Sequence, residues 1–295
     1  MSILLLKLAG KTRVDKFYIL LHNKSTVHYI GGIKVKQIKA ILVDIDDCLL
    51  PFGESPTHEC HLAFEQIGKY VEMANRGEFP LISFCSGREF NYVIPLAGLL
   101  HWPNSWSVVE SGMFLYNPTR KHSKDNPLIN PAYTAKYRDI FERTREQVLA
   151  MCQTLPLVPY RGKLVNIALE LAEGTDLTIE ECYKMIPENI RQLEEKGMIS
   201  IRRSTIAIDI SPATVDKASG VRFFSQYTGI PLEQILGIGD SGGDEPMLNI
   251  VDRVGCPGNA KKDCKELVKQ KGGHVSPFKY AEGVLDIIRH FTGGP

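Results

Sequence analysis

The sequence predicts an α/β protein in which a parallel sheet covered by helices is interrupted by a smaller α+β domain. Strand-like apolar runs alternate with helical patterns up to about residue 116, the order changes between 117 and 212, and the alternation returns from 213 onward. Such alternation is typical of parallel sheets, because each crossover between parallel strands needs a helix. We therefore assign 37–116 and 213–295 to the core, 117–212 to the second domain, and 1–36 to an N-terminal extension without an assigned role.

The first part of the core begins with a buried strand. The apolar run at 38–43 predicts that strand, 57–74 has the apolar spacing of a helix, and 81–85 predicts the next strand. A third strand is predicted at 108–109, followed by a turn and a short strand within 110–117. In a parallel sheet of this kind the binding crevice lies at the carboxyl ends of the strands.

The second domain mixes helices and strands. Its predicted elements are a helix at 132–153, a strand at 163–171, a second helix that ends before Gly197, and strands at 198–203 and 206–211. Thr178 and Glu181 form a capping box at the start of the second helix, and Pro187 must kink or divide that helix. In the last strand Ile206, Ile208 and Ile210 alternate with less apolar residues, which predicts a half-buried sheet.

The core pattern resumes after Pro212. A helix is predicted at 215–227, a strand at 235–239, a helix through 247–250 and a final helix at 281–291. We find no internal repeat and no low-complexity segment.

Composition narrows the function classes. The 295 residues include 35 Lys and Arg and 34 Asp and Glu, a net charge of +1, so no strong field favours nucleic acid or a membrane as partner. The seven cysteines are odd in number and form no C-x-x-C, and no apolar stretch approaches the 18 residues of a membrane span. We expect a cytoplasmic monomer or homodimer that acts on a small molecule.

Acidic side chains follow two of the predicted strands. Asp44 and Asp46 come directly after the first strand, and Asp240 and Asp244 follow the strand at 235–239. Two unit charges about 4 Å apart interact by roughly 4 kcal/mol at an effective dielectric near 20, so four converging carboxylates require a cation. Oxygen ligands favour a hard divalent ion, and we predict Mg²⁺.

These residues are suited to the cleavage of a phosphate ester. One of Asp44 and Asp46 would attack phosphorus and the other would protonate the leaving oxygen, which divides the displacement into two steps. Lys217, at the start of a predicted helix, would add positive charge near the phosphoryl oxygens, and Ser86, after the strand at 81–85, would add a hydroxyl donor.

The motif order resembles the haloacid dehalogenase superfamily of phosphohydrolases. Its motifs are similar to Asp44-Ile-Asp-Asp-Cys-Leu49, Ser86 in Cys-Ser-Gly-Arg, Lys217 and Gly239-Asp-Ser-Gly-Gly-Asp244, and a later turn is similar to Gly258-Asn-Ala260. An insert between the second and third motifs resembles the cap of Cof-type sugar phosphatases, sucrose-phosphate phosphatases and archaeal phosphoglycolate phosphatases. The resemblance implies a Rossmann-like parallel-sheet core with an α+β cap.

The resemblance also implies a role for each matched residue. Asp44 would form an aspartyl-phosphate, and Asp46 would act as acid and then base. The implied Mg²⁺ ligands are Asp44, Asp46 through its backbone carbonyl, Asp240 and Asp244. The phosphoryl group would be held by Ser86, Gly87 and Lys217, with Ser241 and Asn259 in support.

The chain departs from the family pattern at several positions. Cys48 and Asp47 stand where Thr or Val and Gly are usual, and we interpret both as neutral for the chemistry. Gly243 and Ser111 each replace an Asn, and these losses could weaken turnover. Cys48 and Cys85 flank the site, and we expect them to be buried structural thiols.

Residues of the cap would decide the substrate. The cations that could recognise an anionic leaving group are Arg88, Arg161, Lys163, Arg202 and Arg203. We predict a Mg²⁺-dependent phosphatase for a small phosphorylated metabolite, either a sugar phosphate or a phosphoglycolate-like organic acid phosphate. Two alternatives remain open, a phosphomutase of the same superfamily and a non-catalytic phosphoryl-binding regulatory protein. A receiver domain, which also uses an Asp, Mg²⁺ and a Lys, is disfavoured by the long insert between Ser86 and Lys217.

Overall fold

The computed structural model describes residues 28–30, 33–35, 37–126, 144–203 and 207–293, and it comprises two units, Met1–Gln37 and Ile38–Pro295. In the first unit, β1 (His28–Ile30) and β2 (Ile33–Val35) pair antiparallel, a hairpin that the sequence pattern did not predict. Within the described ranges, no helix combines the length and the apolar character that a membrane crossing requires. All further elements belong to the second unit.

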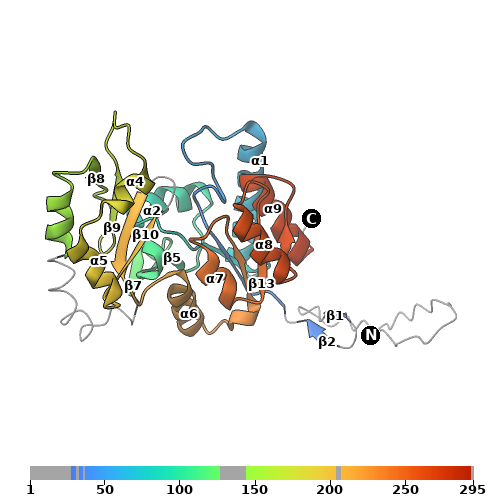
Figure 1. The fold of residues 1–295 in the computed structure, drawn as a ribbon. Helices are drawn as coiled ribbons and strands as arrows, with labels where there is room; N and C mark the ends of the chain where they lie inside the picture. Colours follow the sequence, from blue (N-terminus) through green and yellow to red (C-terminus); the bar gives the residue numbers. More distant parts are fainter. Residues whose placement is uncertain (1–27, 31–32, 36, 127–143, 204–206, 294–295) are drawn as a thin grey trace, which may run out of the picture. The chain divides into compact units, whose positions relative to one another are not determined.

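A parallel sheet of five strands forms the centre of the second unit (Figure 1). In spatial order its strands are β14 (His274–Val275), β13 (Arg253–Cys256), β12 (Ile235–Ile238), β3 (Ala40–Val43) and β4 (Leu81–Phe84). Every residue of β3 is buried, because helices cover both faces of the sheet. The parallel-sheet core is therefore confirmed.

The helices form two layers around this sheet. One apolar cluster joins the sheet to α1 (His58–Asn75), α2 (Phe90–Leu99) and α9 (Tyr280–Thr292). A second cluster joins the other face to α6 (Lys217–Thr228), α7 (Glu245–Ile250) and α8 (Lys262–Gln270). Along β3 the side chains alternate between the clusters, with Ile41 in the first and Leu42 in the second. A short 3₁₀ turn, η3 (Leu232–Gln234), leads into β12.

A small antiparallel sheet extends the core beyond β4. It contains β5 (Ser107–Val109), β6 (Phe114–Asn117) and β7 (His122–Asp125), with the 3₁₀ turn η1 (Glu110–Gly112) between the first two. A parallel bridge between Cys85 and Val108 connects β5 to the strand end of β4. The turn η1 thereby lies beside the carboxyl ends of the central strands.

The insert has its own antiparallel sheet and its own apolar core. The strand order is β10 (Ile199–Arg203), β11 (Ala207–Pro212), β9 (Ile167–Leu171) and β8 (Leu157–Pro159). Ile208 and Ile210 are fully buried among the helices α4 (Ile179–Lys184) and α5 (Glu188–Glu195). Pro187 stands between these helices, so the predicted helix is divided, and the predicted capping box of Thr178 and Glu181 is present.

Some elements differ from the sequence prediction. Of the helix predicted at 132–153, residues 144–151 are helical and 132–143 lie outside the described residues, as does Ile206. The pattern missed β7, β8, β13, β14, α2 and α8. Helix α2 contains Pro95 and is apolar around most of its circumference, so it lacks the usual periodicity. Helix α8 buries only Cys264 and Val268, too few positions to stand out in a Lys-rich segment.

Candidate functional site

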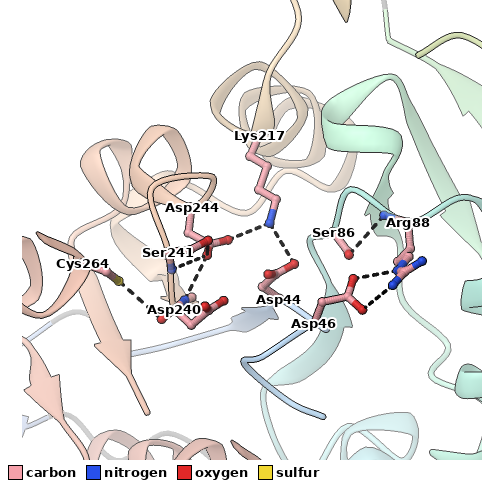
Figure 2. A network of polar contacts seen from close by, with 10 residues as sticks. Asp44, Asp46, Ser86, Arg88, Lys217, Asp240, Ser241, Asp244 and Cys264 are labelled. Atoms are coloured by element: carbon pink, nitrogen blue, oxygen red, sulfur yellow. Dashed lines mark hydrogen bonds and ion pairs between the residues drawn. The ribbon is translucent and has the colours of Figure 1, made fainter. Parts of the chain in front are cut away.

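Three carboxylates converge at the carboxyl ends of two neighbouring strands. Asp44 directly follows β3, Asp240 follows β12 by two residues, and Asp244 precedes α7. One oxygen of each carboxylate lies within 4.8 Å of the others, and all three residues are buried (Figure 2). Parallel pairing of β3 with β12 brings these distant stretches of sequence together.

The turn after β12 folds tightly around Asp244. Its Oδ2 atom accepts hydrogen bonds from the backbone N–H groups of Asp240 (2.9 Å) and Ser241 (3.1 Å). A Cβ atom at Gly239 would lie 2.4 Å from the Cβ of Asp244, so only glycine allows this approach. The expected supporting residue Ser241 thus contributes its backbone to the orientation of Asp244.

Lys217 is the cation of the cluster. It is the first residue of α6, and its Nζ lies 2.8 Å from Asp44 Oδ1 and 2.6 Å from Asp244 Oδ1 (Figure 2). Burial opposes its charge, but the neighbouring Asp244 and Asp44 carboxylates raise the pKa of Lys217 well above its usual value. The ammonium group is therefore held in its charged form between two acids.

Two glycines allow α6 to deliver Lys217 to the site. Gly112 in η1 has φ of 106°, and a Cβ atom there would lie 2.1 Å from the carbonyl oxygen of Asp216. A Cβ atom at Gly220 would lie 2.6 Å from the Cα of Gly112. Asp216 caps the helix by accepting the N–H of Ser219 at 2.8 Å. The start of α6 is thus packed directly onto the turn beside the strand ends.

The electrostatics of the cluster fit a divalent cation. Burial, followed by repulsion from Asp244, raises the pKa of Asp44 to about 7, and burial with Asp244 and Asp44 raises that of Asp240 to about 8. The buried Oδ1 of Asp240 has no hydrogen-bond partner among the described residues. Three acids beside one lysine leave a negative site whose oxygen donors suit a hard divalent ion. Asp44, Asp240 and Asp244 are the residues that could hold it.

Asp46 points away from this cluster. Its carboxylate accepts two hydrogen bonds from Arg88, from Nε at 2.7 Å and from Nη2 at 2.8 Å (Figure 2). The guanidinium also lies over two rings, 5.1 Å from the centroid of Phe52 and 4.4 Å from that of Tyr92. The side chain predicted as acid and base is thus held by one of the residues predicted to recognise a leaving group.

Ser86 and Gly87 form the turn after β4, which neighbours β3 on the side opposite β12. The N–H of Arg88 donates to Ser86 Oγ at 3.2 Å, and the N–H of Ser111 donates to the Ser86 carbonyl at 3.0 Å. Both Ser86 and Gly87 line the same cavity as Asp44, Asp240 and Lys217. Their placement beside the acidic cluster is compatible with the predicted contact to a phosphoryl group.

Asn259 fastens the loop that follows Asp46. Its Nδ2 donates to the Asp47 carbonyl at 2.6 Å, and its Oδ1 accepts the N–H of Tyr280 at 3.0 Å. Asp47 has φ of 56°, a conformation in which glycine and Asp are tolerated better than most residues. The replacement of the usual Gly by Asp is therefore compatible with this turn.

The other departures also have a structural setting. Cys48 and Cys85 are fully buried, and burial raises the pKa of each thiol, as expected for structural rather than reactive cysteines. Gly243 is exposed, and a Cβ atom there would lie no closer than 3.6 Å to Ser241 Oγ. Ser111 has φ of 57°, a left-handed conformation that suits Asn better than Ser.

The site opens into a cavity of about 880 Å³ that core and insert line together. On the insert side, Lys163 Nζ lies 2.6 Å from Asp209 Oδ1. Arg202 and Arg203 also line the cavity, and Arg203 forms an ion pair with Glu180. The exposed Arg161 is not among the lining residues.

Several lining residues of the insert escaped the sequence prediction. They are Tyr160, Asn166, Glu170 and Asp209. The strand alternation at 207–211 was the available signal for Asp209, since the face opposite buried Ile208 and Ile210 turns toward the cavity. Tyr160 and Asn166 lie in or beside a loop without a periodic pattern, and only the fold reveals their position.

Comparisons with known proteins agree with this arrangement. A family model of haloacid dehalogenase-like hydrolases matches residues 159–288. A phosphoglycolate phosphatase of Thermoplasma acidophilum is 34% identical over 131 residues, which cover 44% of this chain and 54% of that protein. One from Methanospirillum hungatei is 29% identical over 137 residues, covering 46% and 57%. The chain spans about half the length of these curated relatives.

Solved structures share the fold over most of their length. A Thermoplasma acidophilum protein superposes with a TM-score of 0.62 at 21% identity, covering 87% of this chain and 99% of that one. The sucrose-phosphatase of Synechocystis sp. PCC6803, solved with sucrose and phosphate, superposes with a TM-score of 0.61 at 17% identity, covering 87% and 98%. At sequence identities this low, the similarity shows a shared fold and nothing more specific.

Proposed function

We propose that this chain, whose resemblance to the haloacid dehalogenase-like hydrolases is confirmed by the family match and the shared fold, is a Mg²⁺-dependent phosphatase acting on a small phosphorylated metabolite. The observation that supports this most directly is the position of Asp44. Its carboxylate contacts Lys217 and lies among two further acids, at the floor of a cavity also lined by Ser86 and Gly87.

The proposed reaction has two displacements at phosphorus. An Asp44 oxygen attacks phosphorus, the bond from phosphorus to the leaving oxygen breaks, and Asp46 donates a proton to that oxygen. Water then attacks the aspartyl-phosphate while Asp46 accepts its proton, which releases phosphate and restores Asp44. Bound Mg²⁺ would supply positive charge that neutralises the phosphoryl oxygens and lowers the repulsion among the acids.

The other residues bind and orient the phosphoryl group. Lys217 offsets its charge, and Ser86 with the backbone of Gly87 provides hydrogen-bond donors. An anionic phosphoryl group that enters beside Ser86 competes with Asp46 for the Arg88 guanidinium. That competition releases the Asp46 carboxyl group for proton transfer, so substrate binding precedes acid catalysis.

The charges of the cavity favour a sugar phosphate over phosphoglycolate. Lys163 is paired with Asp209, Arg203 with Glu180, and Arg88 with Asp46. Glu170 adds an acid to the lining. A leaving group rich in hydroxyls finds donors and acceptors here, whereas a carboxylate meets two acids and, apart from Arg202, insert cations that already have acidic partners.

The decisive experiment is a panel of phosphate esters assayed for phosphate release, with and without Mg²⁺. The panel should contain sugar phosphates, phosphoglycolate and acetyl phosphate. We expect Mg²⁺-dependent release that falls about a thousandfold or more in Asp44→Asn, whereas the exposed control Asp252→Asn retains the wild-type rate. If Asp44→Asn released phosphate as fast as the wild type, the mechanism would be contradicted.

The same panel distinguishes the alternatives. A phosphomutase would isomerise a sugar phosphate without releasing phosphate. A non-catalytic protein would release none from any ester, while both wild type and Asp44→Asn would bind a phosphorylated ligand in calorimetry.

A further inference from the structure

Glu110 connects the phosphate-binding turn to the insert. Its own N–H donates to the Arg88 carbonyl at 2.9 Å, and the next residue, Ser111, donates to the Ser86 carbonyl at 3.0 Å. These two bonds fasten the start of η1 to the turn that contains Ser86, Gly87 and Arg88. The position of Glu110 is therefore fixed relative to the site.

The Glu110 side chain reaches the insert. It is completely buried, its Oε1 accepts the N–H of Leu164 at 2.7 Å, and its Oε2 accepts the N–H groups of Val165 at 3.0 Å and Asn166 at 3.4 Å. Asn166 returns a bond from Nδ2 to the Glu110 carbonyl at 3.1 Å. Bonds from successive backbone amides to one carboxylate are charge-assisted, and their burial protects them from competing water.

The backbone around Glu110 adopts an uncommon conformation. Glu110, Ser111 and Gly112 have φ of 47°, 57° and 106°, three left-handed residues in succession. Non-glycine residues persist in this region only where their surroundings impose it. Here the conformation directs the carboxylate of Glu110 toward the insert while its N–H stays on the Ser86 turn.

The residues held by Glu110 end the loop between β8 and β9. This loop, 160–166, also contains Tyr160 and Lys163, and both line the cavity. The Tyr160 hydroxyl donates to Glu89 Oε1 at 3.0 Å, and Lys163 contacts Asp209. The same loop thus carries the groups that would face a leaving group.

We propose that Glu110 is a positioning residue that fastens the insert loop 160–166 to the phosphate-binding turn and thereby holds the leaving-group side of the cavity in place. The residue acts through Tyr160 and Lys163 and does not contact the reacting atoms. The kinetic part of this inference rests on the proposed phosphatase function, whereas the structural part does not.

The test is Glu110→Gln in the full-length protein with Mg²⁺, followed by hydrogen–deuterium exchange and kinetics. The Gln side chain is uncharged, and its amide N–H groups would face the backbone N–H groups of the loop, which cannot accept a hydrogen bond. We expect the peptide containing residues 164–166 to exchange about tenfold faster, with the central sheet unchanged. We also expect kcat/KM for a sugar phosphate to fall at least about fivefold more than for acetyl phosphate, mainly through KM, since acetyl phosphate barely reaches the loop.

A matched control exists within the insert. Glu181 also accepts a backbone N–H, that of Thr178 at 2.7 Å, but it is exposed and does not touch the core. Glu181→Gln should leave the exchange of residues 164–166 and the ratio between the two substrates unchanged.

Asn166→Ala is the second variant, because it deletes only the bond to the Glu110 carbonyl. It should raise exchange in the same peptide by about threefold, and it keeps the connection between the loop and the Ser86 turn testable if Glu110→Gln does not fold. Unchanged protection of 164–166, or faster exchange spread evenly over the chain, would overturn the proposal. If the wild type hydrolyses no ester, the proposed function fails, and the exchange data alone decide on Glu110.

Discussion

The strand-end site and the insert surface line one cavity, yet their charged side chains are arranged differently. At the strand ends three buried acids lie together and only one lysine, which contacts Asp44 and Asp244, offsets them, so negative charge is left over. On the insert, Lys163 faces Asp209 and Arg203 faces Glu180, and the other lining charges, Arg202 and Glu170, are opposite in sign, so the charges are nearly balanced. An unbalanced site requires a cation from solution, whereas a balanced surface recognises polar groups without one.

This difference separates the residues that would carry out the reaction from those that would select the substrate. The acidic cluster would supply the same metal-assisted reaction for any phosphate ester, because it meets only the phosphoryl group. The paired charges of the insert meet the remainder of the substrate. Changes at the strand ends should therefore affect all substrates, and changes on the insert should affect some substrates more than others.

The largest expected effect concerns metal and pH. Burial and neighbouring acids raise the folded pKa of Asp44 to about 7 and that of Asp240 to about 8, above unfolded values near 4. Between these limits the folded state binds more protons than the unfolded state, so the metal-free protein should lose stability as pH rises from about 5 to 8. Saturating Mg²⁺ at pH 8 should raise Tm by roughly 5 °C or more.

Thermal unfolding with Mg²⁺ or EDTA across this pH range measures the effect. Asp240→Asn is the informative variant, because it removes one repelling charge and one metal ligand. It should be more stable than wild type at pH 8 in EDTA, should respond little to Mg²⁺, and should lose most activity. A wild-type Tm that rises with pH in EDTA would contradict the unbalanced cluster.

A smaller effect is expected on the insert. Asp209→Asn removes the acid that neutralises Lys163, so the lysine becomes available to a carboxylate. We expect kcat/KM for a sugar phosphate to fall about three- to tenfold and that for phosphoglycolate to rise, with acetyl phosphate affected least. Steady-state kinetics on the three esters measure this, and Lys69→Met, which breaks the exposed pair with Glu65 in α1, is the control. A parallel decrease for all three esters would remove the distinction between site and insert.

The two regions also differ in how far the sequence predicted them. Asp44, Asp240 and Lys217 could be singled out because each follows a strand or begins a helix, and parallel pairing then determines where such residues meet. Tyr160 could not, since its contact with Glu89 spans 71 residues and depends on how a loop without periodicity folds back onto the core. Nor could the pairing of Arg88 with Asp46, because both residues were interpreted separately and only the fold shows that they neutralise each other.

The smallest expected effect lies at Ser111, between the two regions. Its left-handed conformation, with φ of 57°, favours Asn, whose side chain tolerates this region better than Ser or Ala. Ser111→Asn should therefore stabilise the protein by about 0.5 kcal/mol, or raise Tm by roughly 1–2 °C, and Ser111→Ala should not. Differential scanning calorimetry in Mg²⁺ at pH 7 measures both. Ser111 is bonded to the Ser86 turn and neighbours Glu110. A gain in stability without a change in substrate preference would therefore mean that the connection between the loop 160–166 and the Ser86 turn depends on the Glu110 carboxylate rather than on the strained backbone of Ser111. If Asn is no more stable than Ser, other contacts compensate the conformation, and the strain argument at this turn fails.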